Sequence, residues 1–314
     1  MSVTEAGAVP AGKAPEKRES GKSDARPPAR GLRGDAARRF FRNPMAIVGL
    51  VLITIFVVVA ILAPWIAPYS PKDNSWLSEV RPGVYPGPSA EHWLGIDPLG
   101  RDVFSRLVHG ARQSLLIGVV SLALGATAGV FLGLLAGAFG GWVDTVVMRF
   151  VDIMLSVPGL LFAIAVAAML GQSLTSVMIA IAVVNVPIFA RLLRGEMLGQ
   201  RTADYVLAAK SLGISRAGIV FRHVLPNSFT PILVQGTLTL ALAIVEAAGL
   251  AFLGLSGSDP STPEWGRMLN DAQSTLAAAP MLAFYPGLAI VLAALGFTLV
   301  GESLREALDP KMRR

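Results

Sequence analysis

The chain of 314 residues contains no cysteine, few histidines and little charge. Without thiols it can form neither disulfides nor thiolate metal sites. Its three histidines, His92, His109 and His223, lie far apart and make no metal-binding spacing. Charged residues amount to 15% of the chain, whereas soluble domains carry roughly a quarter. These shortages argue against a metal-dependent or cysteine-based enzyme, and we predict no catalytic, cofactor-binding or metal-binding residues.

Long apolar runs take the place of the missing charge, with 53% hydrophobic residues and a mean hydropathy of +0.59. A helix needs roughly 20 apolar residues to cross about 30 Å of hydrocarbon. Six segments approach that length, so we predict an all-α integral membrane protein with six transmembrane helices. The predicted spans are residues 46–67, 114–138, 150–170, 176–193, 231–255 and 281–300.

Two of these spans have features of their own. The second contains a glycine at every fourth position from Gly125 to Gly137, a pattern that predicts close approach of a neighbouring helix. The fourth is short and contains Asn185 and Pro187, which predicts a kinked or partly re-entrant segment.

The basic residues are distributed unevenly along the chain. Most of the 27 Lys and Arg residues lie in residues 1–45, in residues 195–229 and after the sixth span. Six spans place both termini on one side of the membrane, and cytoplasmic loops carry an excess of Lys and Arg. We therefore predict that both termini are cytoplasmic. The same asymmetry accounts for the pI near 10.0 without any nucleic-acid partner.

The segments outside the spans differ in composition. Residues 1–35 are rich in Ala, Pro, Gly and charge and are predicted to be a disordered basic cytoplasmic tail. Residues 36–45 mix basic and aromatic side chains, which predicts an interfacial segment on membrane lipid. The membrane domain then covers residues 46–314, with outer loops 68–112 and 256–280 and an inner segment 195–229. In the first outer loop, Leu99 to Leu107 suits a short amphipathic helix.

The inner segment 195–229 has strong local signals. Ala203 to Leu212 favours a helix, and Gly213 can adopt the left-handed conformation of a helix end. Ser215 is placed to cap a second helix, which Pro226 closes before the fifth span. The pattern predicts two helices joined at a glycine corner, with small side chains beside the corner that let it enter a groove on another protein.

At these residues the chain resembles the permeases of bacterial ABC importers. Their EAA loop has the form Glu-Ala-Ala, three residues, Gly, nine residues, Ile, one residue, Leu-Pro. In this sequence Ala208-Ala209, Gly213 and Leu225-Pro226 have that spacing, whereas Leu207 replaces the Glu and His223 the Ile. The resemblance implies a type I (MetI-like) permease fold in the bacterial inner membrane.

Other motifs narrow the resemblance to the C-type permease of dipeptide and oligopeptide importers, from about residue 40 to the C-terminus. These motifs are Leu94–Asp102, Tyr205–Ala209, Arg222–Asn227, Glu246–Leu255, Pro263–Gly266, Phe284–Ile290 and Leu308–Pro310. The resemblance implies a peptide permease that works beside a second homologous permease, two cytoplasmic ABC ATPases and an extracytoplasmic substrate-binding protein. The chain has no Gly-x-x-x-x-Gly-Lys-Ser/Thr phosphate loop, so ATP hydrolysis is expected in the partner subunits.

Two groups of functional residues are predicted. The ATPase-coupling residues are Tyr205, Leu207, Ala208, Ala209, Leu212, Gly213, Ser215, Arg216, Arg222 and Pro226. The candidates for the pathway or gate are Glu246, Asn185 and Gln235, because polar groups in a span face the bundle interior or a cavity. The alternative for Glu246 is a strut that ties its helix to the 256–280 loop, and for Asn185 and Gln235 a bridge between helices.

Other functions remain open at this point. The same architecture could import nickel chelates or glutathione instead of peptides. A secondary transporter or channel would carry internal repeats and paired intramembrane charges, which the sequence does not clearly have. A membrane-embedded enzyme would need a histidine cluster, a serine–histidine pair or a carboxylate pair within the spans, and we find none there.

Overall fold

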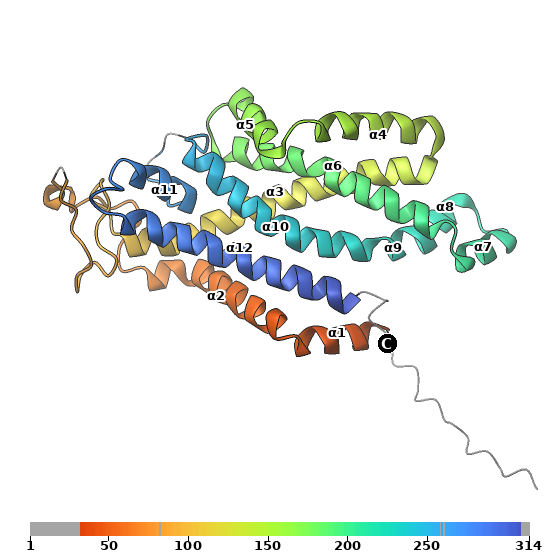
Figure 1. The fold of residues 1–314 in the computed structure, drawn as a ribbon, viewed down its shortest axis with the longest axis horizontal. Coiled ribbons are helices and arrows are strands. Elements are labelled where there is room, and N and C mark those ends of the chain that lie inside the picture. Colours follow the sequence, from red (N-terminus) through yellow and green to blue (C-terminus); the bar gives the residue numbers. More distant parts are fainter. Residues whose placement is uncertain (1–31, 82, 258, 260, 309–314) are drawn as a thin grey trace, which may run out of the picture.

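The computed structural model describes residues 32–81, 83–257, 259 and 261–308, and it is an elongated bundle of helices (Figure 1). Most of the predicted disordered tail, residues 1–31, lies outside the described residues. The helices are α1 Leu32–Arg42, α2 Pro44–Ile66, η1 Leu77–Glu79, α3 Val103–Phe139, α4 Gly141–Leu155, α5 Gly159–Leu170, α6 Leu174–Gln200, α7 Asp204–Ser211, α8 Arg216–Ile219, η2 Val220–Val224, α9 Leu225–Asn227, α10 Phe229–Phe252, α11 Trp265–Gln273 and α12 Met281–Leu308.

Five of these helices, α2, α3, α6, α10 and α12, are long and apolar enough to cross a membrane. The pair α4 and α5 counts as a sixth span if the two are taken together, with a 93° bend between them. The predicted span 150–170 is therefore two helices. The bend falls at Pro158-Gly159, where proline lacks an N–H group and disfavours a helical conformation in the residue before it.

The partly re-entrant alternative predicted for the fourth span is wrong. Helix α6 runs without interruption through Pro187 for 27 residues. Membrane helices tolerate an internal proline when neighbouring helices and side chains satisfy the disturbed backbone. Asn185, two residues earlier, donates its side-chain amide to the carbonyl of Ile181 at 2.9 Å, which supports the helix locally.

The second span is longer than its apolar core because α3 begins at Val103. Asp102 caps this helix by accepting a hydrogen bond from the backbone N–H of Ser105 at 2.7 Å. The short helix predicted from Leu99 is thus the first turns of α3, and Leu99 itself lies in the turn before it. The polar residues of these turns pack against other protein segments, which a hydropathy pattern cannot show.

Helices α3 and α6 form the centre of the bundle and pack closely through the predicted glycine positions. A Cβ atom added at Gly125 would lie 2.6 Å from the carbonyl oxygen of Ala182, and one at Gly133 would lie 2.6 Å from that of Ala190. Real Cβ atoms do not come so close, so only glycine permits this backbone approach. The predicted close helix contact is confirmed.

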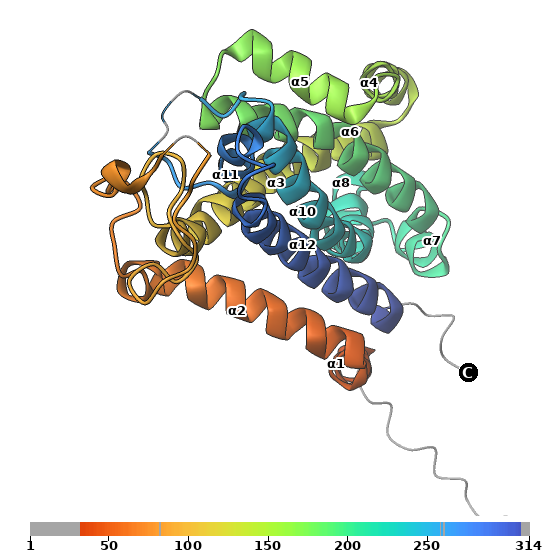
Figure 2. The same ribbon diagram turned by 60° about the vertical axis from the view of Figure 1, so that its left-hand side comes forward.

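The broken pair α4 and α5 is held against α6 on one side of the bundle. Arg194 of α6 donates to both carboxylate oxygens of Asp144 in α4, at 2.9 and 2.7 Å. Arg191 and Asp152 form a second, more exposed ion pair at 2.6 Å. Helices α2 and α12 pack together on the other side (Figure 2).

The bundle has two distinct ends. We call the end with residues 68–102 and α11 the cap end, and the end with α7, α8 and α9 the knob end. Figures 1 and 2 show α1 and the end of α12 at the knob end as well. At the cap end Trp265 is 1% exposed and donates its indole N–H to the carbonyl of Leu107 at 2.9 Å. This tryptophan fixes α11 onto the first turns of α3.

Candidate functional site

The knob, residues 201–228, turns sharply at Gly213. This glycine has φ 76°, in the left-handed region that favours glycine. Its backbone N–H donates to the carbonyl of Lys210 at 3.0 Å, and the N–H of Ile214 donates to that of Ala209 at 3.2 Å. These two bonds form a Schellman motif, which satisfies the last carbonyls of α7 and sets the direction of the chain beyond it.

The second helix of the knob begins as the sequence predicts. The hydroxyl of Ser215 accepts a hydrogen bond from the backbone N–H of Gly218 at 3.2 Å and caps α8. The chain continues through a π-helical turn, η2, into α9. Only Ser228 separates α9 from α10. Pro226 therefore lies within a nearly continuous helical path, and the helix end predicted there is only a one-residue interruption before the fifth span.

The knob shares a hydrophobic core with the membrane helices. Val206 and Ala209 of α7 and Val224 of η2 are buried together with residues of α6 and α10. Phe189, Leu193 and Met197 of α6 and Ile232 of α10 complete this cluster. Because the interior is closely packed, we expect a displacement of the knob to move the ends of α6 and α10 with it.

The predicted coupling residues divide between two faces of the knob. Ala209 is buried in the core just described, whereas Leu212 is 81% exposed. The other members of the set are all exposed: Tyr205, Leu207, Ala208, Gly213, Ser215, Arg216, Arg222 and Pro226. The structure thus brings all ten together on one small, rigid projection with an exposed apolar surface.

The three pathway candidates do not lie together. Asn185 is buried against α3, where a Cβ at Gly125 would be 3.1 Å from its Cβ, and its side-chain amide donates to Ile181 of its own helix. Gln235 donates to the hydroxyl of Thr239 at 3.2 Å and lines a cavity of about 380 Å³ between α6, α10 and α12. Glu246 is half-buried, and the described residues show no hydrogen bond to its Oε2 atom. The strut to the 256–280 loop is not seen in the described residues.

A buried ion network at the cap end was not predicted. Arg101 contacts Asp97 at 2.5 Å and Asp271 at 2.9 Å, and Arg106 lies 3.4 Å from Asp97. Asp97 also stabilises its own turn, since it accepts from the backbone N–H groups of Leu99 and Arg101. Nothing in the local sequence indicates the partner on α11.

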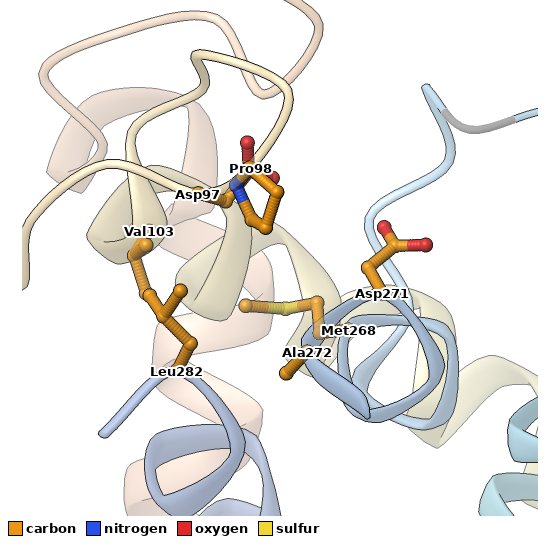
Figure 3. A pocket seen from close by; sticks show the side chains of 7 residues that line it. All are labelled: Asp97, Pro98, Val103, Met268, Asp271, Ala272 and Leu282. Atoms are coloured by element: carbon orange, nitrogen blue, oxygen red, sulfur yellow. The ribbon is translucent and has the colours of Figure 1, made fainter. Parts of the chain in front are cut away.

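A narrow pocket of about 10 Å³ lies beside this network, between the segment before α3 and helices α11 and α12 (Figure 3). Figure 3 shows Val103 and Leu282 on one side of it and Met268, Asp271 and Ala272 of α11 on the other, with Asp97 and Pro98 above. It has room for about one water molecule, so it is not a substrate site. Within the part of the chain that the structure describes, no group of three potential metal ligands occurs.

Glu264 is another buried ionisable residue at the cap end. It is 2% exposed, and this burial raises the pKa of its carboxyl to about 7, against the opposing effects of a hydrogen bond from Ser256 and the charge of Arg267. Arg267 also donates to the backbone carbonyl of Gly257. The cap end therefore combines several buried charges that hold irregular loops in place.

Two family descriptions match the chain. Residues 129–314 match the binding-protein-dependent transport system inner membrane component, and residues 31–81 match the N-terminal transmembrane domain of oligopeptide transport permease C. The chain belongs to this permease family. It is therefore a multi-pass protein of the inner membrane, and permeases of this kind work with an ATPase and a substrate-binding protein. The predicted resemblance is confirmed.

Curated relatives match most of the chain. A dipeptide transport system permease protein of Alkalihalophilus pseudofirmus is 46% identical over 89% of this chain and 90% of its own length. A glutathione transport system permease protein of Pectobacterium atrosepticum is 42% identical over 88% of this chain and 90% of its own length. The corresponding Escherichia coli protein is 45% identical over 88% of this chain and 89% of its own length.

A solved structure supports the fold of this permease. The chain resembles an inward-facing MetNI methionine ABC transporter with a TM-score of 0.52 and 20% sequence identity, over 65% of this chain and 96% of that one. At that identity the likeness concerns the fold alone. The predicted type I (MetI-like) permease fold is confirmed.

Proposed function

We propose that this permease forms half of a passage for dipeptides or oligopeptides, opened in alternation to the two sides of the membrane by separate ATPase subunits. A second homologous permease would form the other half, with two ATPases at the knob end and a substrate-binding protein at the cap end. The support for peptide cargo is the 46% identity to a dipeptide permease over 89% of the chain.

The coupling role rests on the construction of the knob. Its corner is fixed by two backbone hydrogen bonds, its exposed face carries Leu207 and Leu212, and its buried face joins the core of α6 and α10. A groove on an ATPase that receives the exposed face would move these two helices when the ATPase dimer closes on ATP. Arg216 and Arg222, both exposed, would contact the ATPase beside the corner.

Glutathione is the second candidate cargo. Relatives at 42% and 45% identity are named for glutathione transport, and glutathione is itself a small peptide. We expect the complete importer in proteoliposomes to take up a labelled dipeptide only with ATP and its binding protein present. Competition with unlabelled glutathione separates the two cargoes. Uptake by this chain without an ATPase would contradict the proposal for either cargo.

The proposal places the knob end in the cytoplasm, and the absence of native cysteine allows a direct test. Ser211→Cys places a thiol on the exposed surface of α7, and the matched Ser78→Cys places one on the exposed surface of the cap end. In intact cells whose outer membrane has been removed, we expect a membrane-impermeant maleimide to label only Ser78→Cys. Ser211→Cys should react after the membrane is opened and the ATPase subunits are removed. The reverse pattern would contradict the orientation.

A further inference from the structure

A basic cleft lies between the knob and the end of α3. It has a volume of about 230 Å³ and is lined by Phe139 of α3, by Arg201 after α6, and by Val206 and Lys210 of α7. Arg216 and apolar residues of α8 and η2 complete it. Four separate elements therefore converge on the cleft, which is far larger than the roughly 10–15 Å³ that a single water needs.

The cleft is positively charged. Arg201, Lys210 and Arg216 come from different parts of the knob, and none of the described residues that line the cleft is acidic. In the part of the chain that the structure covers, none of the three forms a salt bridge. Arg201 is oriented by one hydrogen bond at 2.6 Å to the carbonyl of Ala138. Three cations around a space of this size suit an anion with several acceptor oxygens.

The surroundings of the cleft suit a lipid. Phe139 is 73% exposed, and Trp142, at the start of α4 three residues later, is 77% exposed. Aromatic side chains at the ends of membrane helices lie at the level of the lipid headgroups. The wall of the cleft formed by Val206, Ile219 and Val220 is apolar. An occupant with a phosphate next to hydrocarbon matches both the charge and the apolar wall.

We propose that this cleft binds the phosphate-bearing headgroup of an anionic phospholipid. The proposal rests on the inward orientation given above, because the cytoplasmic leaflet is rich in anionic lipid and basic pockets between helices on that side bind such headgroups. Arg201 and Lys210 contact the phosphate, Arg216 adds positive charge to the cleft, and Phe139 lies beside the acyl chains. The lipid joins the end of α3 to the knob and holds the knob at a fixed distance from the membrane surface.

The lipid does not compete with the proposed ATPase contact on α7. Val206 and Lys210 are four residues apart and share one face of this helix, whereas Leu207 and Ser211 share another. Val206 is buried, and Leu207 is exposed. The knob therefore presents one face to the lipid and another to the ATPase, so anionic lipid is expected to influence coupling without displacing the partner.

Trp142 provides a probe for this site. Of the five tryptophans, Trp76 and Trp93 lie in residues 68–102, Trp265 begins α11 and Trp65 lies in the last turn of α2, shortly before that segment, whereas Trp142 follows the end of α3 at the start of α4. The assembled importer is placed in nanodiscs of phosphatidylcholine with increasing fractions of brominated phosphatidylglycerol, which quenches nearby tryptophans. Subtracting the signal of a Trp142→Phe importer isolates Trp142. We expect saturable quenching that exceeds the quenching by the same fraction of brominated phosphatidylcholine.

Variants distinguish a defined headgroup site from non-specific attraction of anionic lipid to basic side chains. Lys210→Gln is expected to raise the half-saturating fraction about fivefold, the effect of one cation near an anionic headgroup, and Lys210→Arg to retain binding. Arg42→Gln removes an exposed cation of α1 outside the cleft and should change nothing. Equal effects of Lys210→Gln and Arg42→Gln, or no preference for phosphatidylglycerol, would overturn the proposal. Relief of quenching by inorganic phosphate would assign the cleft to a soluble anion and overturn the lipid. A chain inserted in the membrane with the opposite orientation would be detected separately by the Ser211→Cys labelling.

Discussion

Uptake is expected to fall about thirtyfold when Gly213 is replaced by valine, while membrane insertion and assembly remain intact. Gly213 has φ 76°, and a non-glycine residue in the left-handed region costs about 1–3 kcal/mol. A strain of about 2 kcal/mol lowers the population of the docking-competent corner roughly thirtyfold. No atom lies within 4 Å of an added Cβ at this position, so the effect comes from backbone strain and not from a clash.

The measurement is ATP hydrolysis and peptide uptake by the same reconstituted importer. We expect Gly213→Val to hydrolyse ATP without proportionate uptake, because the knob no longer transmits the ATPase movement to α6 and α10. Gly213→Asn is the matched control, since asparagine tolerates the left-handed conformation and should retain most of the uptake. Normal uptake by Gly213→Val would remove the knob from the coupling mechanism. Loss of the protein from the membrane would make the position structural instead.

The knob could be predicted in detail because its signals are local. A glycine at a helix end, a serine two residues later and a proline further on act through the backbone within a few residues. The structure places the glycine and the serine as expected, at Gly213 and Ser215, whereas Pro226 lies within α9 and only one residue separates that helix from α10. The function of the exposed face could not be derived from these residues alone, since it depends on a partner. The family resemblance predicted that this partner is an ATPase.

The helix boundaries were less predictable because they depend on tertiary packing. Asn185 and Pro187 favoured a kinked or partly re-entrant span, yet α6 continues through Pro187 as one helix packed against α3, and the sharp bend lies at Pro158. Likewise, α3 extends outward to Val103 because its polar first turns are covered by the cap. Arg106 in those turns is 0% exposed, a burial that no hydropathy window assigns to an arginine.

The cap network was not predictable for a related reason. Asp97, Arg101 and Arg106 are close in sequence, and a turn or cap explains each of them locally. Asp271, which contacts both Arg101 and Arg106, lies on α11, which follows α10 much later in the chain. Only the folded arrangement shows that these charges form one buried cluster. That cluster joins the segment before α3 to α11.

The network leads to the second large effect: Asp97→Ala is expected to destabilise the permease by about 3–5 kcal/mol, the cost of removing one partner from a buried ion pair. Arg101 and Arg106 have side chains that are 3% and 1% exposed, and without Asp97 both depend on Asp271 as their remaining carboxylate partner among the described residues. For a chain of this size we expect the thermal midpoint of the purified permease to fall by roughly 6–10 °C.

Two further variants separate the buried charge of Asp97 from its turn and from surface charge in general. Asp97→Asn keeps an oxygen that accepts from the backbone N–H groups of Leu99 and Arg101 but removes the negative charge. Since two guanidinium groups then share one carboxylate, most of the destabilisation should remain. Glu79→Ala removes an exposed carboxylate from the same end of the bundle and should leave the midpoint unchanged. If Asp97→Asn were as stable as the parent, the turn alone would explain the contribution of Asp97 to stability. The link between the cap segment and α11 would then rest on Trp265.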